Sequence, residues 1–330
     1  MNVTGRIFAR REAGILVMIV LFCALVGVLR PRFLTLNELR IILLLTPLIM
    51  IGAMGQMLVI VARHVDLSIG STQAFAAMVT AMMFKYQPEI PWQLGFLVSI
   101  GVGMALGFLN GGLITLFRLP AIIVTLGTLN LYRGLTFIIS DAKQIDRQFV
   151  PSALKAMSST SPILGIPWII FMALGVALLT YWFANHTRVG RQVFALGSNP
   201  AAAPLRGIPV NAVTLMVFTI SGGLAGLSGI MYASRWGFVN PSNTGAGFEF
   251  QVIAAVVIGG VSINGGVGSV AGVVLGVLLL GCVSAALPLL GIPGTAQSAI
   301  YGAVIIVALL IDRSVRQRGR TVLAAQRAAA

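Results

Sequence analysis

The sequence alternates between long apolar runs and short polar connections. A helix needs about 20 mostly apolar residues to cross the hydrocarbon core of a membrane, whereas the strands of a membrane barrel alternate over about ten. A helix also hydrogen-bonds its own backbone, as lipid requires. The pattern therefore predicts an all-α integral membrane protein with about ten transmembrane helices, at 13–29, 41–61, 67–84, 93–117, 120–139, 165–184, 211–232, 249–262, 268–287 and 296–312.

Composition supports a membrane protein and excludes an ordinary soluble domain. The 330 residues are 58% hydrophobic and 9% charged, against about 45–50% apolar and about 25% charged in soluble domains. The core of a soluble domain of this length could not bury so many apolar residues. We expect residues 1–330 to form a single transmembrane domain. Cys23 and Cys282 both fall in apolar runs, where a packing role is favoured over a disulfide or a metal site.

The formal net charge of +14 comes from 22 Lys and Arg against 8 Asp and Glu. Most of the arginines lie at the ends of apolar runs, so the preference for positive charge on the cytoplasmic side explains them better than binding to nucleic acid does. Ten crossings place both termini on one side. The basic tail 313–330 and the basic loop 185–210 predict that this side is cytoplasmic. The segment 141–164 then faces outward and is expected to contain a short surface helix.

Two polar interruptions stand out within apolar sequence, at 58–71 and at 256–269. The first contains Arg63, His64 and Asp66, and the second contains Asn264 at a matching position. The apolar run at 249–262 is too short to cross alone, which predicts a broken or re-entrant element there. Paired broken segments in the two halves of a transporter are typical of a transport path. We expect these two to approach one another at the centre of the membrane domain and to border the substrate path. A turn with a capped helix start, in which Arg63 and Asp66 pair, is the competing interpretation of the first segment.

Other polar residues inside the spans need partners or a function. Arg133 lies mid-span, with Asn130 on the same helical face. Glu249 is a candidate partner for Arg133, and an internal pair and a substrate contact are both open for the arginine. His64 and His186 do not form a metal site, because there is no other histidine and no cysteine nearby in the sequence.

The sequence lacks motifs for catalysis or energy conversion. No Gly-x-x-x-x-Gly-Lys-Ser/Thr phosphate loop, nucleophile elbow or HExxH pattern occurs in it. The chain is therefore not expected to be an enzyme or to bind a cofactor, and its energy must come from another polypeptide or from a gradient. A gradient-driven transporter would need an ion-coupling carboxylate, for which Asp66 and Glu249 are the candidates.

The loop 185–210 is the longest polar interruption with a cluster of positive charge. It carries Arg188, Arg191 and Arg206, has no acidic residue, and has an Ala-rich centre that favours a short helix. These features predict a contact with a cytoplasmic partner.

Several blocks together resemble a known family. The block His186-Thr-Arg-Val-Gly-Arg-Gln-Val-Phe-Ala-Leu-Gly-Ser-Asn-Pro-Ala-Ala, followed by Gly207-Ile-Pro-Val-Asn211, is similar to the coupling loop of ribose-type ABC importer permeases. Asp66-Leu-Ser-Ile-Gly-Ser71, Pro120-Ala-Ile-Ile-Val-Thr-Leu-Gly-Thr-Leu129 and Ile253-Ala-Ala-Val-Val-Ile-Gly-Gly260 match other family blocks in the same order. The blocks 122–134 and 237–247 look most like the autoinducer-2 and rhamnose permeases.

The resemblance implies a permease subunit in a bacterial inner membrane that imports a monosaccharide or a sugar-like molecule. Its implied partners are a second permease subunit, a periplasmic sugar-binding protein, and cytoplasmic subunits that bind ATP and Mg. Residues expected to contact the ATP-binding subunits are Arg188, Gly190, Arg191, Ala201, Ala202, Arg206 and Gly207. A sugar path should be lined by small, hydroxyl and amide groups, and its candidates are Asp66, Ser68, Asn130, Gln251, Ser262 and Asn264.

Overall fold

The computed structural model describes residues 3–159, 165–294 and 296–307, and the chain is helical in all three ranges. The expected all-α class is confirmed. The only strand-like pairing in the described chain is an isolated bridge between Ile145 and Val239. The helices are α1 (Val3–Leu29), α2 (Leu36–Val61), α3 (Ile69–Tyr86), α4 (Leu94–Leu116), α5 (Ala121–Ile139), α6 (Ser152–Ser159), α7 (Trp168–His186), α8 (Arg188–Ser198), α9 (Val210–Trp236), α10 (Phe248–Ile258), α11 (Val270–Leu289) and a last helix, Ala296–Val307.

Seven of these helices are long and apolar enough to cross a membrane by length and composition. They are α1 from Glu12, α2, α4, α5, α7, α9 and α11. The three other expected spans also form helices, but α3 is less apolar, and α10 and Ala296–Val307 are shorter. The expectation of about ten spans therefore corresponds to seven candidate spans and three further helices in the described residues. The long fourth span is a single continuous helix, α4.

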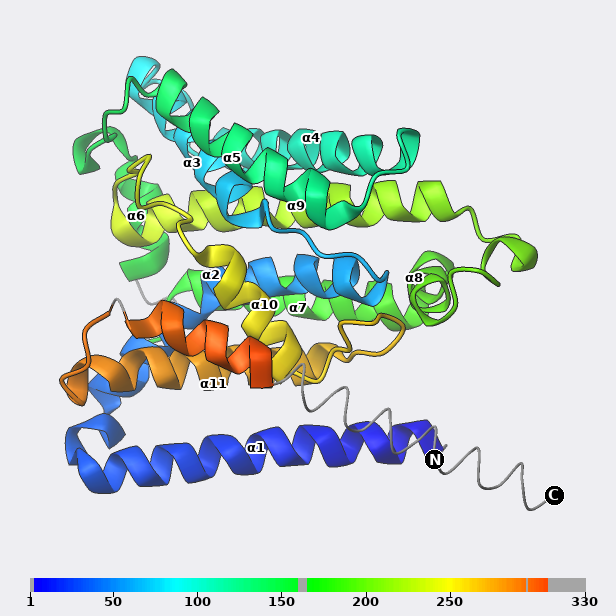
Figure 1. The fold of residues 1–330 in the computed structure, drawn as a ribbon. Coiled ribbons are helices and arrows are strands. Elements are labelled where there is room, and N and C mark those ends of the chain that lie inside the picture. The colour runs from blue at the N-terminus through cyan, green and yellow to red at the C-terminus, as the bar shows by residue number, and fades with distance from the viewer. Residues whose placement is uncertain (1–2, 160–164, 295, 308–330) are drawn as a thin grey trace.

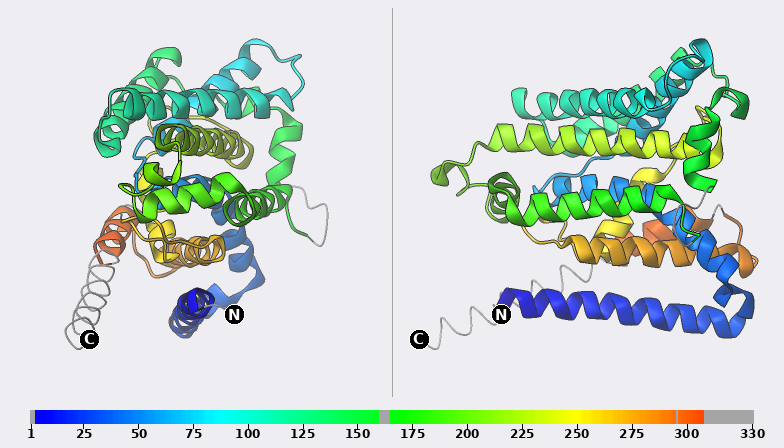
Figure 2. Two further views of the ribbon diagram at one scale, coloured as in Figure 1. Left: turned by 90° about the vertical axis from the view of Figure 1, so that its right-hand side faces the viewer. Right: turned by 180° about the vertical axis from the view of Figure 1, so that it is seen from behind.

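The spanning helices lie side by side with their long axes roughly parallel (Figure 1). From one side of the molecule to the other, the order runs from α4 and α5 through α9, then α2 and α7, then α11, to α1 (Figure 2). Helix α2 is at the centre, with 94% of its most apolar window buried, and α9 follows with 72%. The same window of α1 is 17% buried, because this helix packs at the edge of the bundle.

Glycines allow α4 and α9 to pack closely. A Cβ atom on Gly103 would overlap the carbonyl oxygen of Gly222, and one on Gly226 would overlap that of Ser99. Ser99 adds a hydrogen bond from its Oγ to the carbonyl oxygen of Gly226, at 2.7 Å. Helices in lipid gain stability from such close backbone contact, because the hydrophobic effect does not drive them together there.

The two ends of the bundle carry different short helices (Figure 1). Helix α8 lies across one end, where it is seen end-on in Figure 1 and lengthwise in the left panel of Figure 2. Helix α6 lies at the opposite end, and it is the short helix expected within 141–164. We refer to these as the α8 end and the α6 end. The basic tail 313–330 lies outside the described residues.

Candidate functional site

The carboxylate of Asp66 is part of a buried polar network. Its Oδ1 accepts hydrogen bonds from the backbone N (2.8 Å) and the Oγ (2.7 Å) of Ser68. Ser68 Oγ accepts from Asn110 Nδ2 at 2.8 Å, and Tyr132 donates its hydroxyl to Asn110 Oδ1 at 3.0 Å. All four residues are at most 2% exposed. The network therefore joins the turn before α3 to α4 and α5.

The structure decides two details of the turn interpretation. The sequence offered both Asp66 and Ser68 as caps of the following helix. Ser68 occupies the N-cap position of α3, and Asp66 holds the turn before it. Arg63 is exposed and is in neither of the two ion pairs that the described residues form, so the expected Arg63–Asp66 pair is absent. Asn110 and Tyr132 were not among the predicted site residues. The sequence features that could have identified them are that Asn110 is an amide in a glycine-rich span and that Tyr132 lies one helical turn from other polar residues.

The two broken segments meet, as expected, but at the α8 end of the bundle and not at its centre (Figure 1). The backbone N of Gly266 donates to the carbonyl oxygen of Val61 at 2.9 Å, and Gly268 faces the Val61 side chain. We call this contact the Val61–Gly266 junction. It lies beneath α8 and not at mid-bundle (Figure 1). Close to it, Ser262 is buried in a turn and Asn264 is exposed.

Helix α8 sits directly on this junction. A Cβ atom on Gly197 would overlap the carbonyl oxygen of Val61 and would lie 2.6 Å from the backbone N of Gly266. The backbone of Ser198 faces Gly266 in the same way. Only a glycine at position 197 permits this approach, so the last turn of α8 contacts both broken segments at once.

The rest of α8 is amphipathic. Thr187 caps its start by accepting a hydrogen bond from Gly190 N at 2.9 Å, and Val193 and Leu196 are buried beneath it. The guanidinium-bearing side chains of Arg188 and Arg191 are exposed. A partner could therefore contact the two arginines from outside the bundle.

The other predicted coupling residues divide into two groups. Ala201, Arg206 and Gly207 are exposed and Ala202 is half-buried, so they are open to a partner. Gly190 is buried, and a Cβ there would overlap the carbonyl oxygen of Phe183 on α7, so its role is to let α8 pack on α7. Leu205 lies within the segment 201–207, which the sequence predicts to contact the partner, and it is 88% exposed.

Arg133 anchors a loop instead of pairing with Glu249. Its Nη1 donates to the carbonyl oxygens of Pro241 (3.0 Å) and Thr244 (2.6 Å), in the connection between α9 and α10. Glu249 is absent from both ion pairs of the described chain, and its carboxylate lies against Gly70 at the start of α3. Arg133 therefore holds the 237–247 loop at the α6 end.

The six candidate path residues do not line one common cavity. Gln251 lies on a cavity of about 660 Å³ at the α6 end, between α2, α3, α9, α10, α11 and the last helix, Ala296–Val307. Asp66 and Ser68 belong to the buried network, whereas Ser262 and Asn264 lie near the Val61–Gly266 junction. Asn130 is on the exposed face of α5, where its Nδ2 donates to the carbonyl oxygen of Leu126 at 3.1 Å.

Residues 39–309 match the protein family described as "branched-chain amino acid transport system / permease component". The chain belongs to this permease family. It is 36% identical over 307 residues to the autoinducer 2 import system permease protein LsrC of Salmonella typhi, covering 93% of this chain and 86% of the relative. The proteins of the same name from Photorhabdus luminescens (33% identical, covering 93% and 91%) and Enterobacter sp. strain 638 (35%, covering 93% and 88%) are also similar.

Family membership decides between the function classes that the sequence left open. A permease component is a transport subunit and not itself a catalyst, which agrees with the expectation that the chain is not an enzyme. It also confirms the expected permease of an ABC import system over a transporter that couples to an ion gradient through Asp66 or Glu249. With its seven candidate spans, the chain is a multi-pass membrane permease of the bacterial import-system type.

Proposed function

We propose that this permease imports autoinducer 2 or a monosaccharide-like molecule, driven by ATP hydrolysis on separate subunits. The relatives with more than 30% identity over nearly the whole chain are named as autoinducer 2 import permeases. The sequence blocks at 122–134 and 237–247 support the same class. Both substrates are small and carry several hydroxyl groups, so amide and hydroxyl side chains are suitable contacts for them.

The seating of α8 on the Val61–Gly266 junction is the observation that carries this proposal. In this scheme the α8 end faces the cytoplasm, and an ATP-binding subunit contacts Arg188, Arg191, Arg206 and the exposed Leu205. Because Gly197 brings the α8 backbone against both broken segments, displacement of α8 would move the end of α2 and the α10–α11 connection together. ATP and Mg would be bound by the partner subunit.

A second permease subunit would complete the path on the exposed face of α5. Asn130 lies there between Gly127 and Gly134, and a Cβ atom on either glycine would meet no atom within 4 Å. An amide at membrane depth is costly when it faces lipid alone. A neighbouring subunit and a hydrated path between the two permeases would give Asn130 polar surroundings. A periplasmic binding protein would deliver substrate at the α6 end.

The test is uptake by membranes that contain the permease and its ATP-binding subunits. Arg191→Glu places an acid on the exposed face of α8, and we expect uptake to fall about tenfold, while the permease still folds and ATP hydrolysis continues. Lys143→Glu makes the same charge change at the α6 end, where Lys143 is exposed and paired with Asp141 at 3.5 Å. Equal uptake by the two variants would contradict docking on α8.

A further inference from the structure

The cavity at the α6 end contains a charged group without a partner. Arg235, in the last turn of α9, lines the cavity, and its Nε is buried without a hydrogen-bond acceptor. Its guanidinium lies over the ring of Trp236, with Cζ 5.3 Å from the ring centroid. A buried guanidinium donor that lacks an acceptor is costly, because arginine stays charged and its donors need acceptors.

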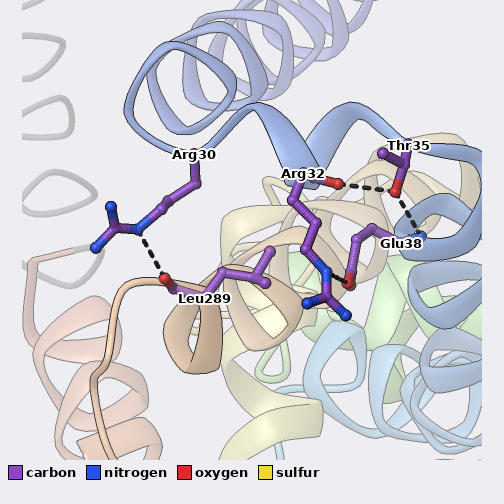
Figure 3. A network of polar contacts seen from close by, with 5 residues as sticks. All are labelled: Arg30, Arg32, Thr35, Glu38 and Leu289. Carbon is purple, nitrogen blue, oxygen red and sulfur yellow. Dashed lines mark hydrogen bonds and ion pairs between the residues drawn. The ribbon is translucent and has the colours of Figure 1, made fainter.

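The acid in the cavity wall is already neutralised. Glu38 Oε1 lies 3.4 Å from Arg32 Nε, and both residues line the cavity (Figure 3). The turn that carries Arg32 is held in place by Arg30, whose Nε donates to the carbonyl oxygen of Leu289 at 2.9 Å (Figure 3). The charged residues that line the cavity therefore leave one uncompensated positive charge, that of Arg235.

The cavity also offers free amide groups. The side chains of Gln251, Asn243 and Gln297 line it, and none of the three has a hydrogen bond to another residue in the described part of the chain. Ser284 Oγ and the Tyr301 hydroxyl, which are 2.9 Å apart, add a hydroxyl pair. Most of the remaining wall is apolar and comes from α2, Phe248 and the end of α11, and Gln73 and Tyr232 also line it. A volume of about 660 Å³ is in the usual range for a small-molecule site.

We propose that this cavity binds a small hydroxylated molecule that carries a phosphate or carboxylate group, with the anionic group on Arg235 and the hydroxyls on the three amides. An anion supplies the countercharge that Arg235 lacks among the described residues, and hydroxyls can both donate to and accept from side-chain amides. The loop that Arg133 anchors contributes Asn243 to the wall, so that anchor also shapes the site. Binding in this cavity does not depend on the proposed function. Only its role in import, as a receiving site at the outer end, rests on that function.

The experiment measures binding alone, with the full-length permease in phosphatidylcholine nanodiscs and without the ATP-binding subunits. Tryptophan emission is the readout, because Trp236 lies beside Arg235. The probe is ribose 5-phosphate, with ribose and inorganic phosphate as comparisons. We expect saturable binding of ribose 5-phosphate that is about tenfold tighter than the binding of either comparison compound.

Three variants test whether the probe binds in the cavity. Arg235→Gln should weaken binding about tenfold or more, and Gln251→Leu, which keeps every charge, should weaken it by a smaller factor. Lys143→Gln removes a positive charge at the same end but outside the cavity, and it should bind as the wild type does. If Arg235→Gln does not fold, weaker binding by Gln251→Leu still tests whether the probe occupies the cavity.

Four results would overturn the site. They are unchanged binding by the folded cavity variants, equal binding of ribose and ribose 5-phosphate, equal binding of inorganic phosphate, and loss of probe binding in phosphatidylglycerol nanodiscs. The last would show that the cavity takes a lipid headgroup. Failure of the proposed importer function would instead appear as absent ATP-driven uptake while probe binding is intact.

Discussion

At the scale of single residues, most polar side chains inside the bundle have a hydrogen-bond partner within the protein, either a backbone carbonyl oxygen or another side chain. Asp66 is the clearest case, since both hydrogen bonds to its Oδ1 come from Ser68, two positions along the chain. Asn110 and Tyr132 extend the network to two other helices. A carboxylate held in this way has a structural role, and the exposed residues Asn130 and Asn264 are better placed to meet a passing molecule.

Asp66→Asn should therefore reduce the amount of folded protein more than it alters substrate preference. The variant loses a charge-assisted pair of hydrogen bonds and places two amide donors in a buried site, at a cost of about 1–3 kcal/mol. The yield of monodisperse protein and its thermal unfolding in detergent would measure the loss. Asp141→Asn is the control, because the Asp141 side chain is 82% exposed. Normal yield together with a new pH dependence of uptake would contradict a structural role for Asp66.

At the scale of elements, the apolar pattern predicted where helices lie much better than it predicted their environment. Each of the ten apolar runs contains a helix, because long apolar sequence in lipid has to form one. The pattern could not tell that α2 would be central and α1 peripheral, since both are uniformly apolar. Which helices become central depends on glycine contacts such as that of Gly103 with Gly222, which pair residues far apart in the chain.

The edge position of α1 can be tested with the native cysteines. The Sγ atoms of Cys23 on α1 and Cys282 on α11 are 3.9 Å apart, and both thiols are free. We expect mild oxidation to join them, because thiols this close need only a small movement to form a disulfide. A protease site inserted at 160–164 would give two fragments that stay together on a non-reducing gel. The fragments of Cys23→Ser should separate, and separation of the wild-type fragments would contradict the packing of α1 on α11.

At the scale of the whole molecule, the two ends of the bundle carry different chemistry. The α8 end presents exposed arginines above a junction of two broken segments, and the α6 end presents a largely apolar cavity with several amide side chains and one uncompensated arginine. The sequence indicated both broken segments and the basic loop. It did not indicate the cavity, which is formed by residues from six helices and the connections between them, or the contact of Gly197, which depends on the fold around it.

We propose that α8 passes the movement of an ATP-binding subunit to the Val61–Gly266 junction. Gly197→Ala tests it most directly, because the added Cβ would overlap the carbonyl oxygen of Val61 and lift α8 from the junction without altering its exposed arginines. Gly175→Ala is the matched control, since a Cβ there meets no atom within 4 Å.

The measurement is the amount of substrate taken up per ATP hydrolysed, in proteoliposomes that hold the assembled complex. For Gly197→Ala we predict that the ATP-binding subunits still assemble and hydrolyse ATP, while uptake per ATP falls about tenfold relative to the wild type and to Gly175→Ala. Wild-type uptake per ATP by assembled Gly197→Ala complexes would contradict the claim.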